Sequence, residues 1–126
     1  MCRERAAQRP HIFSFAADIA GTIKGAFTGA VAYTKERVQY GVLIGTFQAI
    51  QHLCAEMLVQ VEAAQSVNCY AAWAVDQLDA DEALLAARTA KAYASSVALP
   101  VTETVTETHD RGISSWQERN HLPQLP

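Results

Sequence analysis

Hydrophobic positions recur at three- and four-residue steps along three long stretches of the chain, and this spacing predicts helices. The first helix is expected at about 13–39 and the second at 46–78, with Thr46 as its N-cap. The third is expected to start near Asp81 and to present Leu84, Leu85, Ala87, Ala92, Val97 and Ala98. The first helix presents Ile19, Ile23, Phe27, Ala30 and Val31.

The second stretch has the most regular pattern, a heptad seam with one polar member, Asn68. The seam consists of Phe47, Ile50, Cys54, Met57, Val61, Ala64, Asn68, Ala71 and Val75. A helix of this length spans roughly 50 Å and needs partners to cover its seam. The sequence therefore predicts an all-α fold, an antiparallel up-down helical bundle. Its expected parts are a flexible N-terminal lead at 1–12, the bundle at 13–108 and an irregular tail at 109–126.

Three local features have two interpretations each. Gly21, Gly25 and Gly29 share one helix face, which either weakens the helix or, as we favour, forms a groove for a neighbouring backbone. Asn68 either fixes the register of the bundle or lies at its edge. After Pro100, the β-branched run 101–108 is expected to be a kinked helical continuation or a loop.

Composition and charge remove several classes of function. The net charge of −3 gives no basic surface for a nucleic acid. The apolar stretch 12–31 carries Asp18 and Lys24, so no membrane span is expected and the cytoplasm is the expected location. Three cysteines without a CxxC pair indicate free thiols, and no spacing of His, Cys or carboxylates predicts a metal site.

Two adjoining motifs carry a family resemblance. Residues 33–41 read YTKERVQYG and residues 44–52 read IGTFQAIQH. They closely resemble the acyl-CoA dehydrogenase pattern Y-x-K-E-R-x-Q-F-G-x-x-I-G-x-F-Q-A-I-Q-H, and the similarity continues to about Ser96. This resemblance implies the helical C-terminal domain of that family, which binds FAD at a subunit interface.

The resemblance assigns the cofactor contacts to Arg37, Gln39, Tyr40, Phe47 and Gln48. An arginine fork suits the FAD pyrophosphate, and Tyr40 could pack beside the cofactor. Phe47 and Gln48 belong to the first turn of the second helix, where the helix dipole favours an anion. Without the resemblance, the same residues would be interpreted as an ordinary helix end and a surface glutamine.

The later family motif Q-x-H-G-G-I-G-x-T-W-E is altered here. Residues 107–117 read ETHDRGISSWQ, so Asp110 and Arg111 stand in place of the paired glycines and Glu107 in place of a glutamine. A glutamate there would repel a nearby phosphate. No catalytic base is assigned: the family carboxylate lies beyond residue 126 or near 9–12, where Arg9, Pro10, His11 and Ile12 offer none.

The functional prediction is a truncated acyl-CoA dehydrogenase, FAD-dependent and acting on the α,β-bond of an acyl-CoA from fatty acid or steroid side-chain degradation. The chain is expected to need missing domains or a partner subunit, as a homo- or hetero-oligomer, and to be inactive alone. The alternative is a non-catalytic helical oligomerisation or interaction module.

Overall fold

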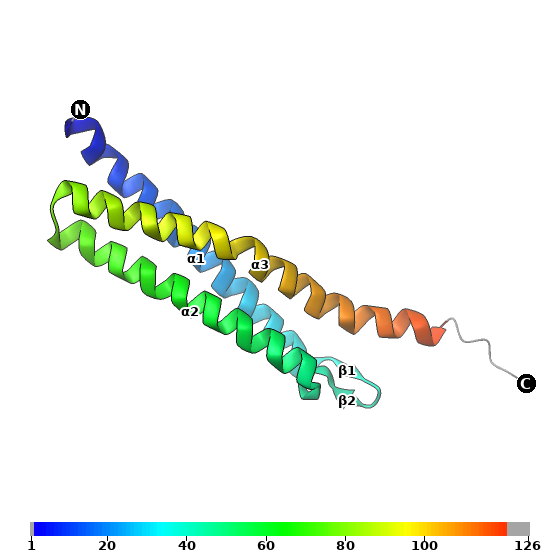
Figure 1. Ribbon diagram of the computed structural model, residues 1–126. Coiled ribbons are helices and arrows are strands. Elements are labelled where there is room, and N and C mark those ends of the chain that lie inside the picture. Colours follow the sequence, from blue (N-terminus) through cyan, green and yellow to red (C-terminus); the bar gives the residue numbers. More distant parts are fainter. Residues whose placement is uncertain (1, 121–126) are drawn as a thin grey trace, which may run out of the picture.

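Three long helices, each antiparallel to the one before it in the chain, form an elongated bundle (Figure 1). A computed structural model describes the backbone of residues 2–120 and the side chains of residues 11–110. Helix α1 spans Cys2–Glu36, α2 spans Gln48–Gln77 and α3 spans Ala80–Asn120. Between α1 and α2 lie strands β1 (Val38–Gln39) and β2 (Val42–Leu43) and the short 3-10 helix η1 (Ile44–Thr46). The predicted all-α up-down bundle is confirmed.

The predicted seam of α2 faces the other two helices. Ile50, Met57, Val61, Ala64 and Ala71 are buried, and Cys54, Asn68 and Val75 are half-buried. Phe47 is the exception, because it precedes the first turn of α2 and is exposed. On the two predicted partners, Ile23 and Ala30 of α1 and Leu84, Ala87 and Val97 of α3 are buried, whereas Leu85 and Ala92 are exposed.

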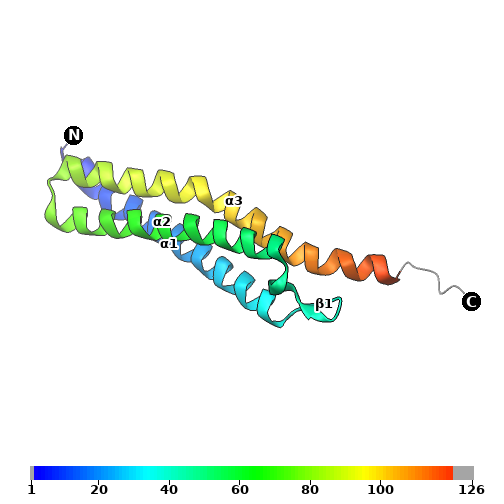
Figure 2. The same cartoon turned by 60° about the horizontal axis from the view of Figure 1, so that its bottom comes forward.

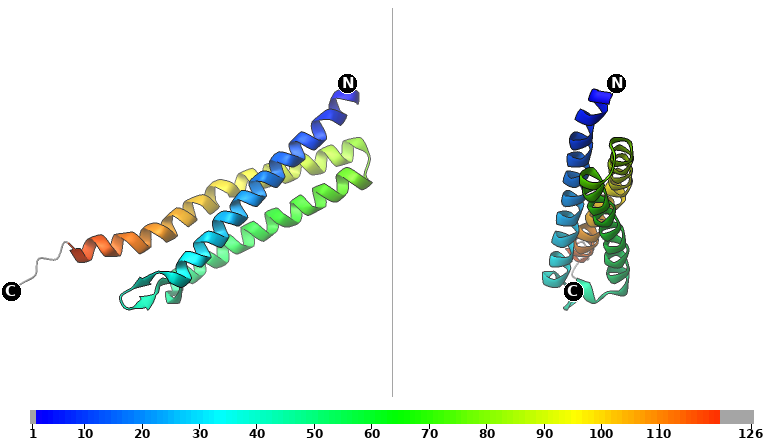
Figure 3. Two further views of the ribbon diagram at one scale, coloured as in Figure 1. Left: turned by 180° about the vertical axis from the view of Figure 1, so that it is seen from behind. Right: turned by 90° about the vertical axis from the view of Figure 1, so that its left-hand side faces the viewer.

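The core changes in character along the bundle. Near the α2–α3 turn it is built mainly of alanine, with Ala16, Ala71, Ala74, Ala86 and Ala90 in one cluster. Nearer the hairpin, a second cluster contains larger residues, among them Ile23, Met57, Val61 and Val101. Small side chains let helix backbones approach closely, which suits the alanine-rich end of the bundle. Figures 2 and 3 show the bundle from other sides.

Both chain ends are more helical than the sequence suggested. The lead predicted to be flexible at 1–12 is helical from Cys2, and the tail predicted to be irregular at 109–126 is helical to Asn120, while residues 1 and 121–126 lie outside the described residues. Both segments were predicted to be flexible or irregular because they contain prolines and polar residues. A long helix tolerates a proline at the loss of one backbone hydrogen bond, as α3 does at the exposed Pro100.

The β-branched run after Pro100 is helical, and its hydroxyls bond back to the preceding turn. Thr104 Oγ1 donates to the carbonyl of Pro100 at 2.9 Å, and Thr108 Oγ1 donates to that of Thr104 at 2.8 Å. Thr102 and Thr106 bond in the same way. Val101 and Thr108 are fully buried, so tertiary packing overrides the β propensity of this segment.

The glycine groove that we favoured from the sequence is wrong within the described chain. A Cβ placed on Gly21, Gly25 or Gly29 would meet nothing within 4 Å, and all three glycines are exposed. They lie on the side of α1 opposite its buried positions Ala16, Ala20 and Ile23. The sequence pattern correctly put them on one face but could not say that no helix of this chain covers it.

Candidate functional site

The first resemblance motif folds into a β-hairpin between α1 and α2. Strands β1 and β2 pair antiparallel, with Val38 opposite Leu43 and Gln39 opposite Val42. Tyr40 and Gly41 form the two-residue loop and both have positive φ, 54° and 82°, as a type I′ turn requires. Helix α1 therefore ends at Glu36 and not at the expected residue 39, because the chain turns into β1. Two-residue strands are too short to leave a periodic pattern, so the sequence predicted only a break here.

The hairpin carries an exposed apolar surface, which we call the hairpin patch. It consists of Val38, Tyr40, Val42, Leu43 and Phe47, all of them exposed. Tyr40 is 64% exposed and meets Phe47 edge to face, with ring centroids 6.4 Å apart. A contiguous exposed apolar surface of this kind marks a contact with a ligand or another protein.

The five residues predicted to contact a cofactor are brought to this end of the bundle. Arg37 is half-buried at the base of β1, and its backbone bonds to Tyr33 and Ile44. Gln48 is exposed at the start of α2, directly after Phe47. Gln39 differs from the others: its side chain is only 3% exposed, so in this conformation its amide is nearly inaccessible to a ligand.

The start of α2 is not capped by a side chain. The N-cap position is occupied by Phe47, which makes no side-chain capping bond, and the first turn has no acidic residue. The predicted cap, Thr46, is wrong: it belongs to η1, and its hydroxyl donates to the carbonyl of Leu43 at 2.6 Å. The N–H groups of Ile50 and Gln51 donate to the carbonyl of Phe47, which leaves those of Gln48 and Ala49 at the helix start, and such groups favour an anion.

Close packing at Gly45 holds the hairpin base against α1. A Cβ on Gly45 would lie 3.0 Å from the carbonyl oxygen of Thr34, which is itself buried. Beside this contact is a groove of 310 Å³ between the last turns of α1 and the first turns of α2, lined in part by Lys35, Ile50 and Cys54. Burial raises the pKa of the Cys54 thiol.

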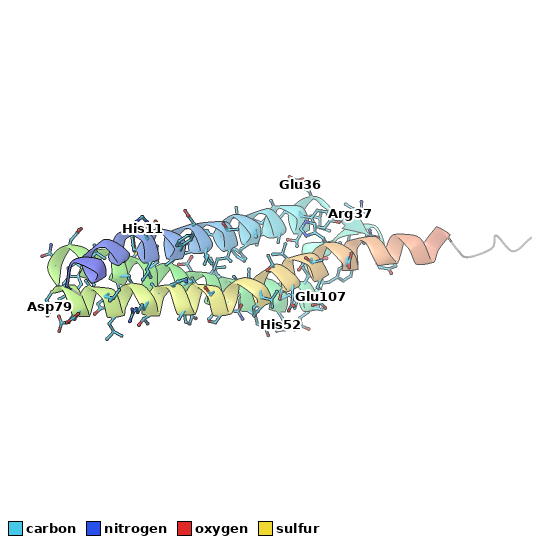
Figure 4. All side chains as sticks on the ribbon, turned by 90° about the horizontal axis from the view of Figure 1, so that it is seen from above. His11, Glu36, Arg37, His52, Asp79 and Glu107 are labelled. Carbon is cyan, nitrogen blue, oxygen red and sulfur yellow. The ribbon has the colours of Figure 1, made fainter. Side chains whose placement is uncertain are left out.

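Helix α3 brings the altered second motif to the same end. The rings of Tyr33 and His109 stack with centroids 4.4 Å apart, which joins the last turn of α1 to residue 109. His109 Nδ1 lies 2.8 Å from the carbonyl oxygen of Val105, so in the neutral ring Nδ1 carries the proton and donates it. Glu107 and Asp110 are exposed on this part of α3. Figure 4 shows Glu36 and Arg37 near this end of the bundle and Asp79 near the other.

Two other features are absent from the described part of the chain. Among the side chains described, at 11–110, no three His, Cys, Asp or Glu residues come together to hold a metal ion. None of the described helices is sufficiently long and apolar to cross a membrane.

Comparison with known proteins gives a family match over most of the chain. The family model for the acyl-CoA dehydrogenase C-terminal domain matches residues 8–117. The Mycobacterium tuberculosis protein named Probable acyl-CoA dehydrogenase FadE25 is 41% identical over 86 residues, 68% of this chain and 22% of that protein. The mitochondrial short/branched chain specific acyl-CoA dehydrogenase of Rattus norvegicus is 39% identical over 83 residues, 66% of this chain and 19% of that protein.

The fold is similar to that of a solved enzyme. Butyryl-CoA dehydrogenase from Megasphaera elsdenii superposes with a TM-score of 0.74 and 30% sequence identity, over 90% of this chain and 29% of that one. The bundle of this chain therefore shares its fold with part of that enzyme. The chain belongs to the acyl-CoA dehydrogenase family and matches its C-terminal domain. It spans about a fifth of the length of the curated relatives named here.

Proposed function

We propose that this chain is the flavin-contacting helical part of an acyl-CoA dehydrogenase, and that FAD binds at the hairpin end. One observation carries the proposal. The hairpin patch lies beside the half-buried Arg37 and the uncapped start of α2, within the region that matches the family. An apolar surface next to a guanidinium and free backbone amides has the features needed to bind a dinucleotide with flat rings and a pyrophosphate.

The residues present fit this cofactor. Arg37 would hold the pyrophosphate together with the first amides of α2, while Tyr40 and Phe47 would pack against a ring of the cofactor. Gln48 is exposed and could offer its amide. The weakest member of the set is Gln39, since its side chain would have to leave the interior to reach a ligand. FAD, when bound, supplies the acceptor for the hydride that leaves the acyl β-carbon.

The described residues do not complete a dehydrogenase site by themselves. Removal of the acyl α-proton needs a positioned carboxylate, and Asp18, an exposed acidic residue of α1, lies eighteen residues before the end of that helix. At 1.5 Å per residue this is roughly 27 Å along the helix. We therefore propose that turnover needs further domains or a partner subunit, and that acyl-CoA is bound by the complete assembly. The relatives, which are several times longer, support this.

The test is a titration of the purified chain with FAD, followed by flavin absorbance and fluorescence. We expect saturable binding that Arg37→Ala weakens at least tenfold, as expected for loss of a charge-assisted hydrogen bond to a phosphate. Arg88→Ala, which removes an exposed arginine of α3, is the matched control and should leave binding unchanged. Equal loss in both variants, or no binding by the unaltered chain, would contradict the flavin assignment.

A second assay separates binding from catalysis. The chain alone should give no turnover with an acyl-CoA and an artificial electron acceptor, because no carboxylate base is in place. Measurable dehydrogenation would refute the need for additional domains.

A non-catalytic oligomerisation module is the alternative function. It is favoured by the exposed Tyr70, Trp73 and Leu85, which lie far from the hairpin. A chain that forms an oligomer and is indifferent to FAD would support it over the flavoprotein.

A further inference from the structure

A second groove lies between the last turns of α2 and the first turns of α3, at the end of the bundle opposite the hairpin. We call it the turn groove, and it has a volume of 590 Å³. Its lining includes Tyr70, Trp73, Leu78, Glu82 and Leu85. Figure 4 shows Asp79, which marks this end, far along the bundle from Arg37. None of the described lining residues belongs to the proposed flavin site, so the turn groove needs a separate explanation.

Two aromatic rings lie side by side on one wall of the turn groove. Tyr70 and Trp73 are three residues apart on α2, so they share one face of the helix. Their ring centroids are 5.9 Å apart, and the ring planes are inclined by 31°. Tyr70 is 54% exposed and Trp73 is 52% exposed, so a ligand can reach both. Because the face of an aromatic ring carries negative partial charge, it attracts a cation that comes within about 6 Å of its centroid.

Helix α3 supplies the opposite wall with one carboxylate and apolar side chains. Glu82 lies in the first turn of α3 and is exposed, and Leu85 follows about one turn later. The first turn is capped by Asp79, whose Oδ1 accepts from the N–H groups of Asp81 and Glu82, so the Glu82 carboxylate is not used as the cap. No lysine, arginine or histidine is among the described residues that line the groove. A cation in the turn groove therefore meets one carboxylate and no like charge from this lining.

The end of α2 adds negative potential at the same place. The last carbonyl groups of a helix have no N–H partner within it, and the helix dipole gives this end a partial negative charge. A basic side chain can offset this charge, but the last turn of α2 has none, and the whole helix contains no lysine or arginine. The same turn instead carries the exposed Asp76. The electrostatic preference of the turn groove is thus for a positively charged ligand.

We propose that the turn groove binds an organic cation, a quaternary ammonium or guanidinium group on a short apolar stem. The cation lies over the rings of Tyr70 and Trp73 with Glu82 as its counter-charge. The stem packs against Leu78 and Leu85. A metal ion fits less well, because it needs several oxygen ligands and the described lining offers one carboxylate. Both rings are half exposed, so the cation stays partly hydrated and the expected Kd is about 1 mM.

The test is a titration of the full chain, followed by the backbone amide shifts of residues 70–82 in two-dimensional NMR spectra. The probes are choline and its neutral isostere 3,3-dimethylbutan-1-ol, which has the same shape without the charge. Choline should give saturable shifts, and the isostere should bind at least about fivefold more weakly, because the rings and the carboxylate act on the charge. N-acetylarginine amide is titrated in the same way. Tighter binding of choline would indicate a free ammonium compound as the ligand, and tighter binding of the arginine derivative would indicate an arginine side chain of another protein.

Three variants test the contacts, each checked for an unchanged circular dichroism spectrum. Trp73→Leu and Glu82→Gln should each weaken choline binding at least about fivefold, whereas Trp73→Phe keeps an aromatic ring and should retain most of the affinity. The matched control, Glu56→Gln, removes an exposed glutamate of α2 outside the turn groove and should leave the Kd unchanged.

Four outcomes would overturn the proposal. They are equal affinity for choline and the neutral isostere, no saturable shift with any cation, full affinity in Trp73→Leu or Glu82→Gln, and an equal loss in Glu56→Gln. Failure of FAD to bind at the hairpin end does not bear on the turn groove, because the two sites share no described residue.

Discussion

Replacing the three exposed glycines of α1 by alanine should stabilise the bundle. Gly21, Gly25 and Gly29 lie in the interior of α1, between Cys2 and Glu36, and an added Cβ meets nothing within 4 Å at any of them. The substitution therefore costs no packing. It gains because glycine has more backbone freedom to lose on folding than alanine and because the added methyl shields the helix backbone.

The expected magnitude follows from the helix interior values. Each Gly→Ala change is worth about 0.8 kcal/mol, so the triple variant should gain roughly 2.5 kcal/mol in unfolding free energy if the three sites add. For a domain of 126 residues this corresponds to a rise in Tm of roughly 10 °C. Urea unfolding and thermal melting followed by circular dichroism at 222 nm measure both quantities.

Gly45→Ala is the opposing control for these substitutions. Its Cβ would lie 3.0 Å from the Thr34 carbonyl oxygen, so either α1 or η1 must shift and stability should fall. If the triple variant were no more stable than the unaltered chain, or less stable, the glycine face must be packed against something other than solvent. In that case the reasoning from the exposed face fails, and the close-approach groove expected from the sequence would be formed with another molecule.

Three more outcomes are expected. Asn68→Leu should raise the unfolding free energy by about 1 kcal/mol, because Asn68 Oδ1 is buried and accepts no hydrogen bond within the described residues. A lower unfolding free energy, measured by urea unfolding, would show that Asn68 has a hydrogen-bond partner. Glu107→Gln should tighten FAD binding in the titration described above, since the resemblance implies that this motif lies near the phosphates and the substitution removes a negative charge from it. An unchanged Kd would place Glu107 away from the cofactor. At pH 8 a thiol reagent should label the exposed Cys69 faster than Cys54, because burial raises the pKa of Cys54 and leaves less of its thiolate. Mass spectrometry of peptides measures the two labelling rates, and equal rates would contradict this prediction.

Much of the fold could be predicted from the sequence, because burial on a helix depends on a local period. The spacing of Ile50, Met57, Val61 and Ala64 predicted the buried side of α2, and these residues are buried. The start of α3 near Asp81 was also predicted, and Asp79 caps this helix by accepting from the N–H groups of Asp81 and Glu82. Such features involve residues a few positions apart, so neighbouring sequence is sufficient to specify them.

What surrounds each helix was decided only by tertiary structure. The sequence could not show that the glycine face of α1 is left uncovered, nor that Tyr33 stacks on His109, a contact between residues far apart in the chain. It also missed the Tyr40–Gly41 turn, where both residues have positive φ, Gln39 is buried and Tyr40 is exposed. Periodicity states which residues share a face, but only the packed helices determine whether that face meets protein or solvent, because that depends on how distant segments are placed together.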